Sequence, residues 1–192
     1  MSLVYIISQH VKRIKKGQPF IGTKFSSLGS RSAINKALST LVFSGLIVRV
    51  ARGVYMRPKF NRYIGQVRPS PLTVMKVITT ANGETIQVHG AEAVRRLGLS
   101  TQMQVVPTYY TSGSSREISI GAASVRLKHV SKDRLQHAGT NVGLVLTALH
   151  YVGKRGMSQE ILSKINEMLS EEELRKLLDC KMPKWMRSSL TS

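Results

Sequence analysis

Acidic side chains are absent from the first 83 residues of this 192-residue chain, and the first carboxylate belongs to Glu84. The same 83 residues contain 14 lysines and arginines, whereas residues 84–192 contain 15 basic and 10 acidic residues, so the formal charges of the two parts are +14 and +5. Surfaces of mixed sign keep a protein dissolved with less self-repulsion. A polyanionic partner explains the excess better, because each phosphate neutralised by Lys or Arg releases condensed counterions. The charge distribution therefore predicts that the first half of the chain binds nucleic acid.

Cysteines, metal-ligand clusters and long apolar runs are also scarce. Cys180 is the single cysteine, which excludes an internal disulfide and fits a reducing cytoplasm. One Cys and five scattered His give no ligand cluster, so we expect neither metal nor cofactor. No apolar run approaches the roughly 20 residues that span a bilayer. Residues 1–17 place apolar residues before charges, the wrong order for a signal peptide, and predict an amphipathic helix. We expect a cytoplasmic, nucleoid-associated protein.

Apolar periodicity predicts three helices in the basic half, at residues 3–14, 24–28 and 31–44. Gly17 ends the first of them, and residues 18–21 are expected to form a short extended link. Thr23 and Ser30 precede the other two helices, where Ser and Thr are favoured N-caps. A brief helix, a tight Gly-containing turn and a longer polar-faced helix are typical of a helix-turn-helix.

Two short strands are expected next, at residues 46–51 and 54–57, on either side of the basic turn Arg52-Gly53. Such a hairpin with a basic tip suits a nucleic-acid backbone or a minor groove. The order of three helices and a hairpin predicts a winged helix-turn-helix domain over residues 1–68.

The polar face of the helix at residues 31–44 carries side chains suited to phosphates and base edges, and no carboxylate that would repel DNA. We expect major-groove contacts from Arg31, Ser32, Asn35, Lys36 and Ser39. Contacts to phosphates or to the adjacent minor groove are expected from Lys24, Arg49, Arg52, Gly53 and Arg57.

Two alternatives stand beside DNA binding. Many amphipathic helices carry Arg, Asn and Lys merely as a solvated face, but the element order, the basic hairpin and the missing acids coincide here. RNA is the lesser possibility, because no aromatic stacking platform is visible in the sequence.

The second half, residues 69–192, is predicted to form an α+β domain after a linker at residues 59–71. Its expected helices are residues 72–80, 90–97, 142–152, 158–169 and 171–180. Its expected strands are residues 84–88, 105–110, 118–120 and 125–129. Ser158 and Ser170, each followed by glutamates, are helix-start signals. The fold class expected for the whole chain is α+β.

Catalytic or metal-binding chemistry has one candidate set, His89, Glu92 and His129. His89 opens a predicted helix and Glu92 lies in its first turn, where a carboxylate is ordinarily stabilising. Nothing else at metal-ligand or triad spacing accompanies these residues, so capping and packing are the preferred interpretation.

Serines at positions 112, 114 and 115 would be nucleophiles only beside a base, and a Gly-Ser turn is the better interpretation. Tyr109, Tyr110 and the segment at residues 182–186 are candidates for contact surface, although such aromatics more often cover a core. The sequence therefore predicts no enzyme.

The hairpin sequence at residues 49–55, preceded by the helix after Ser30, resembles the N-terminal winged helix of AbiEi-type antitoxins of type IV, abortive-infection toxin–antitoxin systems. Segments at residues 88–93, 109–113 and 127–131 are similar to those of a bacterial family grouped with AbiEi. The resemblance implies a protein encoded beside a nucleotidyltransferase-like toxin, whose first domain represses its own promoter at inverted repeats. AbiEi proteins are generally longer, and the resemblance transfers no antitoxin residues.

Our hypothesis is a two-domain, non-enzymatic antitoxin and autorepressor that binds double-stranded DNA, as a dimer on palindromic sites. Its functional partner would be the toxin. The rival hypotheses are a stand-alone transcriptional regulator of a mobile element and a nucleic-acid-processing enzyme that uses His89, Glu92 and His129.

Overall fold

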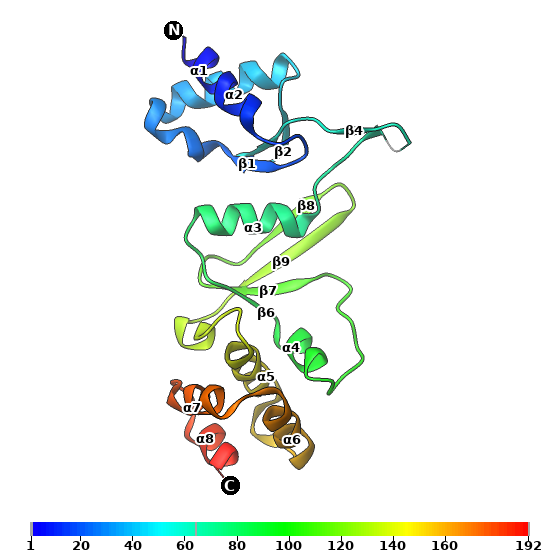
Figure 1. Ribbon diagram of the computed structural model, residues 1–192, viewed down its shortest axis with the longest axis vertical. Coiled ribbons are helices and arrows are strands. Elements are labelled where there is room, and N and C mark those ends of the chain that lie inside the picture. Colours follow the sequence, from blue (N-terminus) through cyan, green and yellow to red (C-terminus); the bar gives the residue numbers. More distant parts are fainter. Residues whose placement is uncertain (1, 64, 192) are drawn as a thin grey trace. The chain divides into compact units, whose positions relative to one another are not determined.

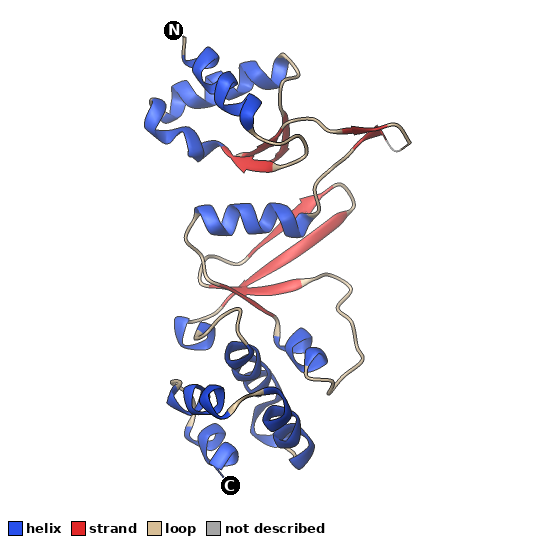
Figure 2. Cartoon of the chain, viewed as in Figure 1, coloured by secondary structure: helices blue, strands red, loops and turns tan. Residues whose placement is uncertain are grey.

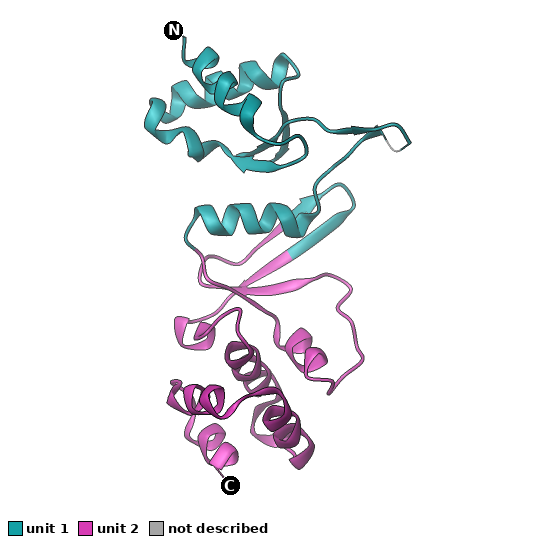
Figure 3. Ribbon diagram, in the orientation of Figure 1, with its two compact units in different colours: residues 1–83, 118–125 teal, residues 84–117, 126–192 magenta. Residues whose placement is uncertain are grey.

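The computed structural model describes residues 2–63 and 65–191 and divides the chain into two compact units (Figure 3). Unit 1 comprises residues 1–83 and 118–125, and unit 2 comprises residues 84–117 and 126–192. Neither segment of unit 1 contains an Asp or a Glu, so every acidic residue of the chain belongs to unit 2. The predicted domain boundary between residues 68 and 69 falls within unit 1 and stays a prediction. The outermost residues of the two predicted domains, 1 and 192, lie outside the described residues.

Two α-helices of unit 1 agree with the periodicity of the sequence (Figure 1): α1 (Leu3–Arg13) and α2 (Arg31–Phe43). Ser30 Oγ accepts a hydrogen bond from the Ala33 amide at 3.3 Å, which confirms the predicted N-cap of α2. Helix α2 buries its apolar stripe against the side chains of α1 and of the segment between the two helices.

The segment between α1 and α2 differs from the prediction. It is a 3₁₀ helix, η1 (Gly22–Leu28), and its N-cap is Ile21 without a side-chain bond, so the predicted cap at Thr23 is wrong. The helix begins earlier because Gly22 is buried and its amide donates to the Gly53 carbonyl at 2.9 Å. A Cβ at Gly22 would lie 3.0 Å from Leu38 Cδ1, so glycine is what allows this close approach.

A three-stranded antiparallel sheet completes this part of unit 1. Its strands are β1 (Pro19–Ile21), β2 (Val48–Ala51) and β3 (Val54–Met56), in the order β1-β3-β2. The expected link at residues 18–21 is therefore an edge strand, with Phe20 opposite Tyr55. Apolar side chains from every one of these helices and strands except β2 share one core: Ile7, Val11, Phe20, Phe25, Ile34, Ala37, Leu38, Leu41, Ile47 and Tyr55, the residue Ile47 coming from the approach to β2.

The predicted linker at residues 59–71 contains a second, two-stranded hairpin. Its strands are β4 (Phe60–Asn61) and β5 (Gly65–Gln66), which pair antiparallel with Phe60 opposite Gln66. Helix α3 (Pro71–Ala81) follows, and Ser70 Oγ accepts from the Thr73 amide at 3.2 Å to cap it.

The larger sheet has the strand order β6-β7-β9-β8. Its strands are β6 (Ile86–Val88), β7 (Thr108–Thr111), β8 (Arg116–Ile120) and β9 (Ala123–His129). Strand β7 pairs antiparallel with β6 and parallel with β9. Helix α4 (Gly90–Arg96) follows β6, and the 3₁₀ helix η2 (Lys132–Leu135) follows β9.

In unit 2, the carboxylate of Glu84, which precedes β6, binds one residue of β7 and one residue of β8. The Arg116 Nη2 donates to both Glu84 carboxylate oxygens at 2.7 and 2.9 Å, and Thr111 Oγ1 donates to Oε2 at 2.7 Å. A Cβ at Gly113 would lie only 2.4 Å from this carboxylate, so the turn after β7 fits closely around it. The first acidic residue of the chain thus has a structural role.

Four helices close unit 2 (Figure 2): α5 (Asn141–Gly156), α6 (Gln159–Met168), α7 (Glu171–Asp179) and α8 (Lys184–Thr191). Ser158 caps α6, and Ser170 forms a capping box with Glu173, as the sequence predicts. Gly153 has a φ of 69° inside α5, so the regular helix stops where the expected one did. Helix α8 was not predicted; its Met186 is buried in the core of unit 2 and Trp185 packs against that core.

Both units contain helices and strands, which confirms the α+β class. Among residues 2–63 and 65–191, no helix combines the length and the apolar character needed to cross a membrane.

Gly143 gives a test of packing in unit 2. An added Cβ would lie 2.2 Å from the His137 carbonyl oxygen and 2.8 Å from Gln87 Nε2. We expect Gly143→Ala to lower the free energy of unfolding by about 1–3 kcal/mol through overpacking, although alanine ordinarily favours a helix by about 1 kcal/mol. Urea titration followed by circular dichroism measures this change. The control is Gly29→Ala, where the new Cβ meets only Leu3 Cδ2 at 3.5 Å; equal effects of the two substitutions would contradict the packing argument.

Candidate nucleic-acid interface

The solvent-facing side of α2 presents the predicted DNA-reading residues. Arg31, Asn35 and Ser39 are four residues apart and share one side of the helix, and Ser32 and Lys36 lie beside them. All five are exposed, because the opposite stripe of α2 is the one buried in the core. The hydroxyl of Ser30 caps the helix, and the first turn of α2 contains no acidic residue.

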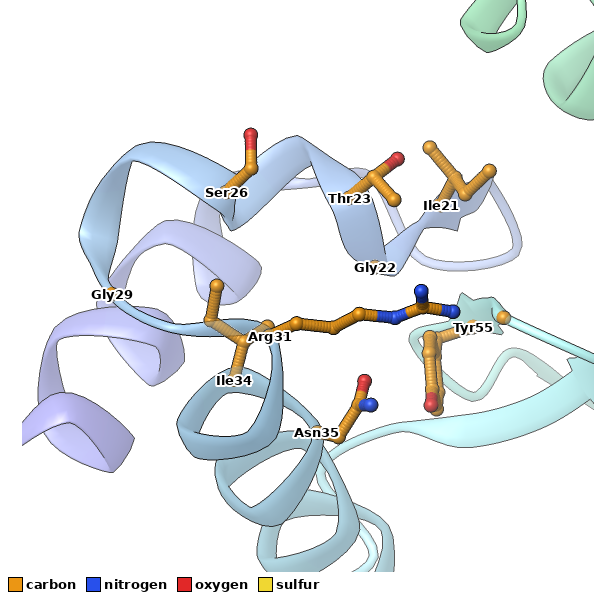
Figure 4. A pocket seen from close by; sticks show the side chains of 10 residues that line it. Ile21, Gly22, Thr23, Ser26, Gly29, Arg31, Ile34, Asn35 and Tyr55 are labelled. Atoms are coloured by element: carbon orange, nitrogen blue, oxygen red, sulfur yellow. The ribbon is translucent and has the colours of Figure 1, made fainter.

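A cavity of about 290 Å³ lies between η1, the first turns of α2 and the turn between β2 and β3 (Figure 4). Three predicted residues line it: Arg31, Asn35 and Gly53. In Figure 4 the guanidinium of Arg31 and the amide of Asn35 both extend toward Tyr55 of β3. The fold therefore brings the start of the predicted reading helix and the tip of the predicted basic hairpin to one hollow.

Three further lining residues have polar side chains and were not predicted as contacts: Thr23, Ser26 and Tyr55. Thr23 and Ser26 are three residues apart on a 3₁₀ helix, so their hydroxyls share one side of it. The sequence contains this spacing, but the spacing indicates a shared side only once the segment is known to be a 3₁₀ helix. Tyr55 comes from β3 through the pairing of the strands, which no local pattern reveals.

The basic hairpin carries Arg49 in β2 and Arg52 in the turn, both exposed. Gly53 has a φ of 74°, a conformation that glycine adopts at little cost, and its carbonyl holds the start of η1. Lys24 is exposed on η1 and lines a different hollow, of about 570 Å³. The predicted contacts are thus spread over α2, η1 and the β2–β3 turn.

Arg57 differs from the other predicted residues because its guanidinium is engaged inside the fold. Its Nη1 donates to the carbonyls of Lys12 at 2.6 Å and Ile14 at 2.9 Å, at the C-terminal end of α1. Carbonyls at a helix end otherwise lack partners, and a cation there also offsets the helix dipole. Arg57 therefore has a capping role, which competes with the predicted contact to phosphate.

The arrangement around this cavity provides donors without fixed negative charge. The Arg31 guanidinium and the Asn35 amide extend into one cavity, which Thr23 and Ser26 also line, and the sequence places no carboxylate in unit 1 (Figure 4). Guanidinium and amide groups form bidentate hydrogen bonds with phosphates and base edges. This surface is chemically suited to an anionic, hydrogen-bonding ligand.

In unit 2, His89 and Glu92 have structural partners. The His89 Nδ1 accepts from the Ala91 amide at 3.2 Å as the N-cap of α4, and it also lies 3.0 Å from Gln104 Nε2. Glu92 binds Arg95 Nε at 2.7 Å and Arg96 Nε at 2.8 Å. The hydrogen bond from Arg95 is the main cause that lowers the pKa of Glu92 to about 2.

His129, the third candidate, is occupied elsewhere. Its Nδ1 is 2.8 Å from the Gly113 carbonyl, and its backbone amide donates to Ser115 Oγ at 2.9 Å. Ser112 Oγ accepts from the Thr85 amide at 2.9 Å. The serine hydroxyls at 112 and 115 thus join backbone segments that are distant in the sequence. Within residues 2–63 and 65–191, no three His, Cys, Asp or Glu side chains form a group that could hold a metal ion.

A second group of titratable side chains, in which only His89 was a candidate from the sequence, surrounds Arg134 of η2. The Arg134 guanidinium lies over the Tyr110 ring, 5.2 Å from its centroid. Burial lowers the pKa of His150, and Arg134 lowers it further. Burial also lowers the pKa of His89, with Lys128 and Arg134 as additional causes. Both rings are therefore neutral near pH 7, and charge in this group comes from the basic side chains.

The Glu92 ion pairs predict a pH-dependent contribution to stability. A carboxylate whose pKa is depressed in the folded state stabilises the fold above its unfolded pKa. We expect Glu92→Gln to lower the free energy of unfolding near neutral pH, and this deficit to shrink as the pH falls from 4.5 toward 2. Urea unfolding of both proteins across this range measures the difference. Glu160→Gln, in the first turn of α6, is the control; a deficit for Glu92→Gln that is independent of pH would contradict the assignment.

Comparison with known proteins gives one family. No curated protein matches the chain. A family model described as a family of unknown function, DUF6088, matches residues 6–177, which include most of both units. The chain therefore belongs to the DUF6088 family.

Proposed function

We propose that unit 1 binds duplex DNA through a winged helix-turn-helix, with α2 as the reading helix and the β2–β3 turn as the wing. The observation that carries this proposal is the complete absence of carboxylates from a folded unit that contains 14 basic residues. Self-repulsion of that size opposes folding. Binding to a polyanion relieves it and gains the free energy of counterion release.

The geometry of α2 supports sequence-selective binding over a merely basic surface. Arg31 and Asn35 line the same cavity as the tip of the wing, and both carry side chains that read base edges. Arg49 and Arg52 lie exposed on the wing, where a phosphate backbone or a minor groove would be contacted. Base contacts would then come from α2, and nonspecific attraction from the wing.

We further propose that the protein is a non-enzymatic antitoxin and autorepressor of a bacterial type IV toxin–antitoxin operon. The resemblance of residues 49–55 to the AbiEi wing supports this identity. The structural partners of His89, Glu92 and His129 argue against catalysis by that set. The counterpart would be a nucleotidyltransferase-like toxin, countered without need of a stable complex, and the operator would contain inverted repeats bound by two copies.

Binding to its own promoter tests the first part of the proposal. Fluorescence anisotropy with the full chain compares the DNA upstream of its gene with a scrambled duplex, over a series of salt concentrations. We expect tighter binding to the upstream DNA that persists at physiological salt. Equal affinities that vanish together as salt rises would reduce unit 1 to a nonspecific polyanion surface.

Co-expression with a neighbouring nucleotidyltransferase-like toxin tests the second part. Relief of growth arrest by the intact chain supports an antitoxin. Selective operator binding without any relief would instead favour a stand-alone regulator, whose second half serves another purpose.

Two substitutions separate base reading from backbone attraction. Asn35→Ala should reduce the preference for the operator over scrambled DNA by about 1–3 kcal/mol, because a bidentate base contact is lost. Arg52→Ala should weaken both duplexes alike and reduce the slope of log K against log salt by about one unit. The anisotropy titrations above measure both quantities.

Arg155→Ala, which removes an exposed cation from unit 2, is the matched control for charge and should leave both quantities unchanged. If Asn35→Ala and Arg52→Ala behaved identically, the assignment of reading to α2 and attraction to the wing would be wrong.

A further inference from the structure

The hairpin of β4 and β5 is built to keep its shape at the surface of unit 1. Asn61 Oδ1 accepts a hydrogen bond from the Tyr63 amide at 2.8 Å within the turn, and the Val67 amide donates to the Lys59 carbonyl at 2.8 Å at the base. We call Phe60, Asn61, Arg62, Tyr63, Gly65 and Gln66 the ribbon. Both ends of the ribbon are thus held by hydrogen bonds.

Two aromatic side chains of the ribbon face solvent. Phe60 is 72% exposed and Tyr63 is 76% exposed, although large apolar side chains are ordinarily buried. The Arg62 guanidinium lies over the Tyr63 ring, 4.5 Å from its centroid, and its Nη2 donates to the Tyr63 hydroxyl. The pair presents a cation on an aromatic platform, and Phe60 remains an exposed apolar wedge.

Cations continue from the wing into the ribbon. A hollow of about 240 Å³ in unit 1 is lined by Arg49 of β2 together with Gln66 of β5 and Arg68 beyond it. Lys59, Arg62 and Arg68 are all exposed, and no acidic residue occurs in this segment. The charge of the ribbon therefore has the same sign as that of the wing.

This charge decides which partner fits the ribbon. A second copy of the chain that docked its own ribbon here would bring the same cations against each other, and unit 1 has no carboxylate to compensate them. Duplex DNA supplies phosphates for the cations and a base step for the aromatic ring. Proteins that bind the minor groove commonly combine Arg or Lys with an inserted apolar wedge such as Phe.

We propose that the ribbon is a third DNA-contacting element, which inserts Phe60 at a base step of the minor groove while Arg62, held on Tyr63, binds the adjacent phosphates. This inference rests on the proposed DNA-binding function and extends it to a contact beyond α2 and the wing. It implies that the protein unstacks and bends the DNA it binds.

Three variants of the full chain test the ribbon against the promoter duplex. The duplex carries a fluorescent adenine analogue whose emission rises when it unstacks, placed at successive positions in separate duplexes. We expect Phe60→Ala to abolish the emission rise and to weaken binding roughly tenfold, the scale of one base–aromatic stacking contact, with the salt slope unchanged. Arg62→Ala should reduce that slope by about 0.9. Tyr5→Ala is the matched control, because Tyr5 is an aromatic residue 51% exposed on α1, outside the ribbon, the wing and α2, and we expect it to bind like wild type.

The possible results distinguish failure of the ribbon contact from failure of the proposed DNA-binding function. Wild type that binds the promoter selectively, with ribbon variants equal to wild type in affinity and emission, would overturn the ribbon contact and leave the proposed function intact. Absence of DNA binding by wild type would overturn both. A wild-type dimer in solution that Phe60→Ala converts to a monomer would assign the ribbon to contacts between copies and also overturn the inference. Circular dichroism checks that every variant is folded.

Discussion

Electrostatic repulsion among the basic residues of unit 1 is the constraint that the rest of its structure has to satisfy. With no carboxylate available, this unit cannot use an ion pair between side chains, and its fold depends on apolar burial and on hydrogen bonds from neutral or cationic donors. Serine hydroxyls start α1, α2 and α3, and the Arg57 guanidinium ends α1. The proposed polyanion binding would consequently be linked to stability, because a ligand that neutralised the cations would also remove a force that opposes the fold.

Unit 2 is stabilised in the opposite way. Glu84 joins Thr111 and Arg116, and Glu92 lies between Arg95 and Arg96. The acidic first turn of α7 adds Glu171, Glu172 and Glu173 near its positive helix end. Acidic residues therefore offset most of the positive charge of unit 2, whereas the 14 basic residues of unit 1 have no acidic residue within that unit to offset them.

The helices of this chain were largely predictable because their signals are local. Apolar residues recur at helical spacing, and serine before a periodic segment marked the starts of α2, α6 and α7. The short strands β1, β4 and β5 were missed, since strands of two or three residues are defined by pairing with distant partners. Helix α8 lacked a recognisable start signal.

In the candidate site, Arg31, Asn35 and Gly53 were predicted from residue type. The position of Tyr55 and the cap by Arg57 depend on contacts across the sheet and at the helix end, which the sequence does not display.

The position of Arg57 determines how the β4–β5 hairpin is attached to the rest of unit 1. Its side chain is bonded to the end of α1, the Gly17 amide donates to its carbonyl at 3.0 Å, and β4 begins three residues later. At the other side of the hairpin, the bond between Val67 and Lys59 closes the base. Hydrogen bonds therefore fix the base of the ribbon, which is not joined to unit 1 by a loose segment of chain. A force applied to the ribbon would therefore reach the end of α1 through three residues of backbone and the hydrogen bonds of Arg57.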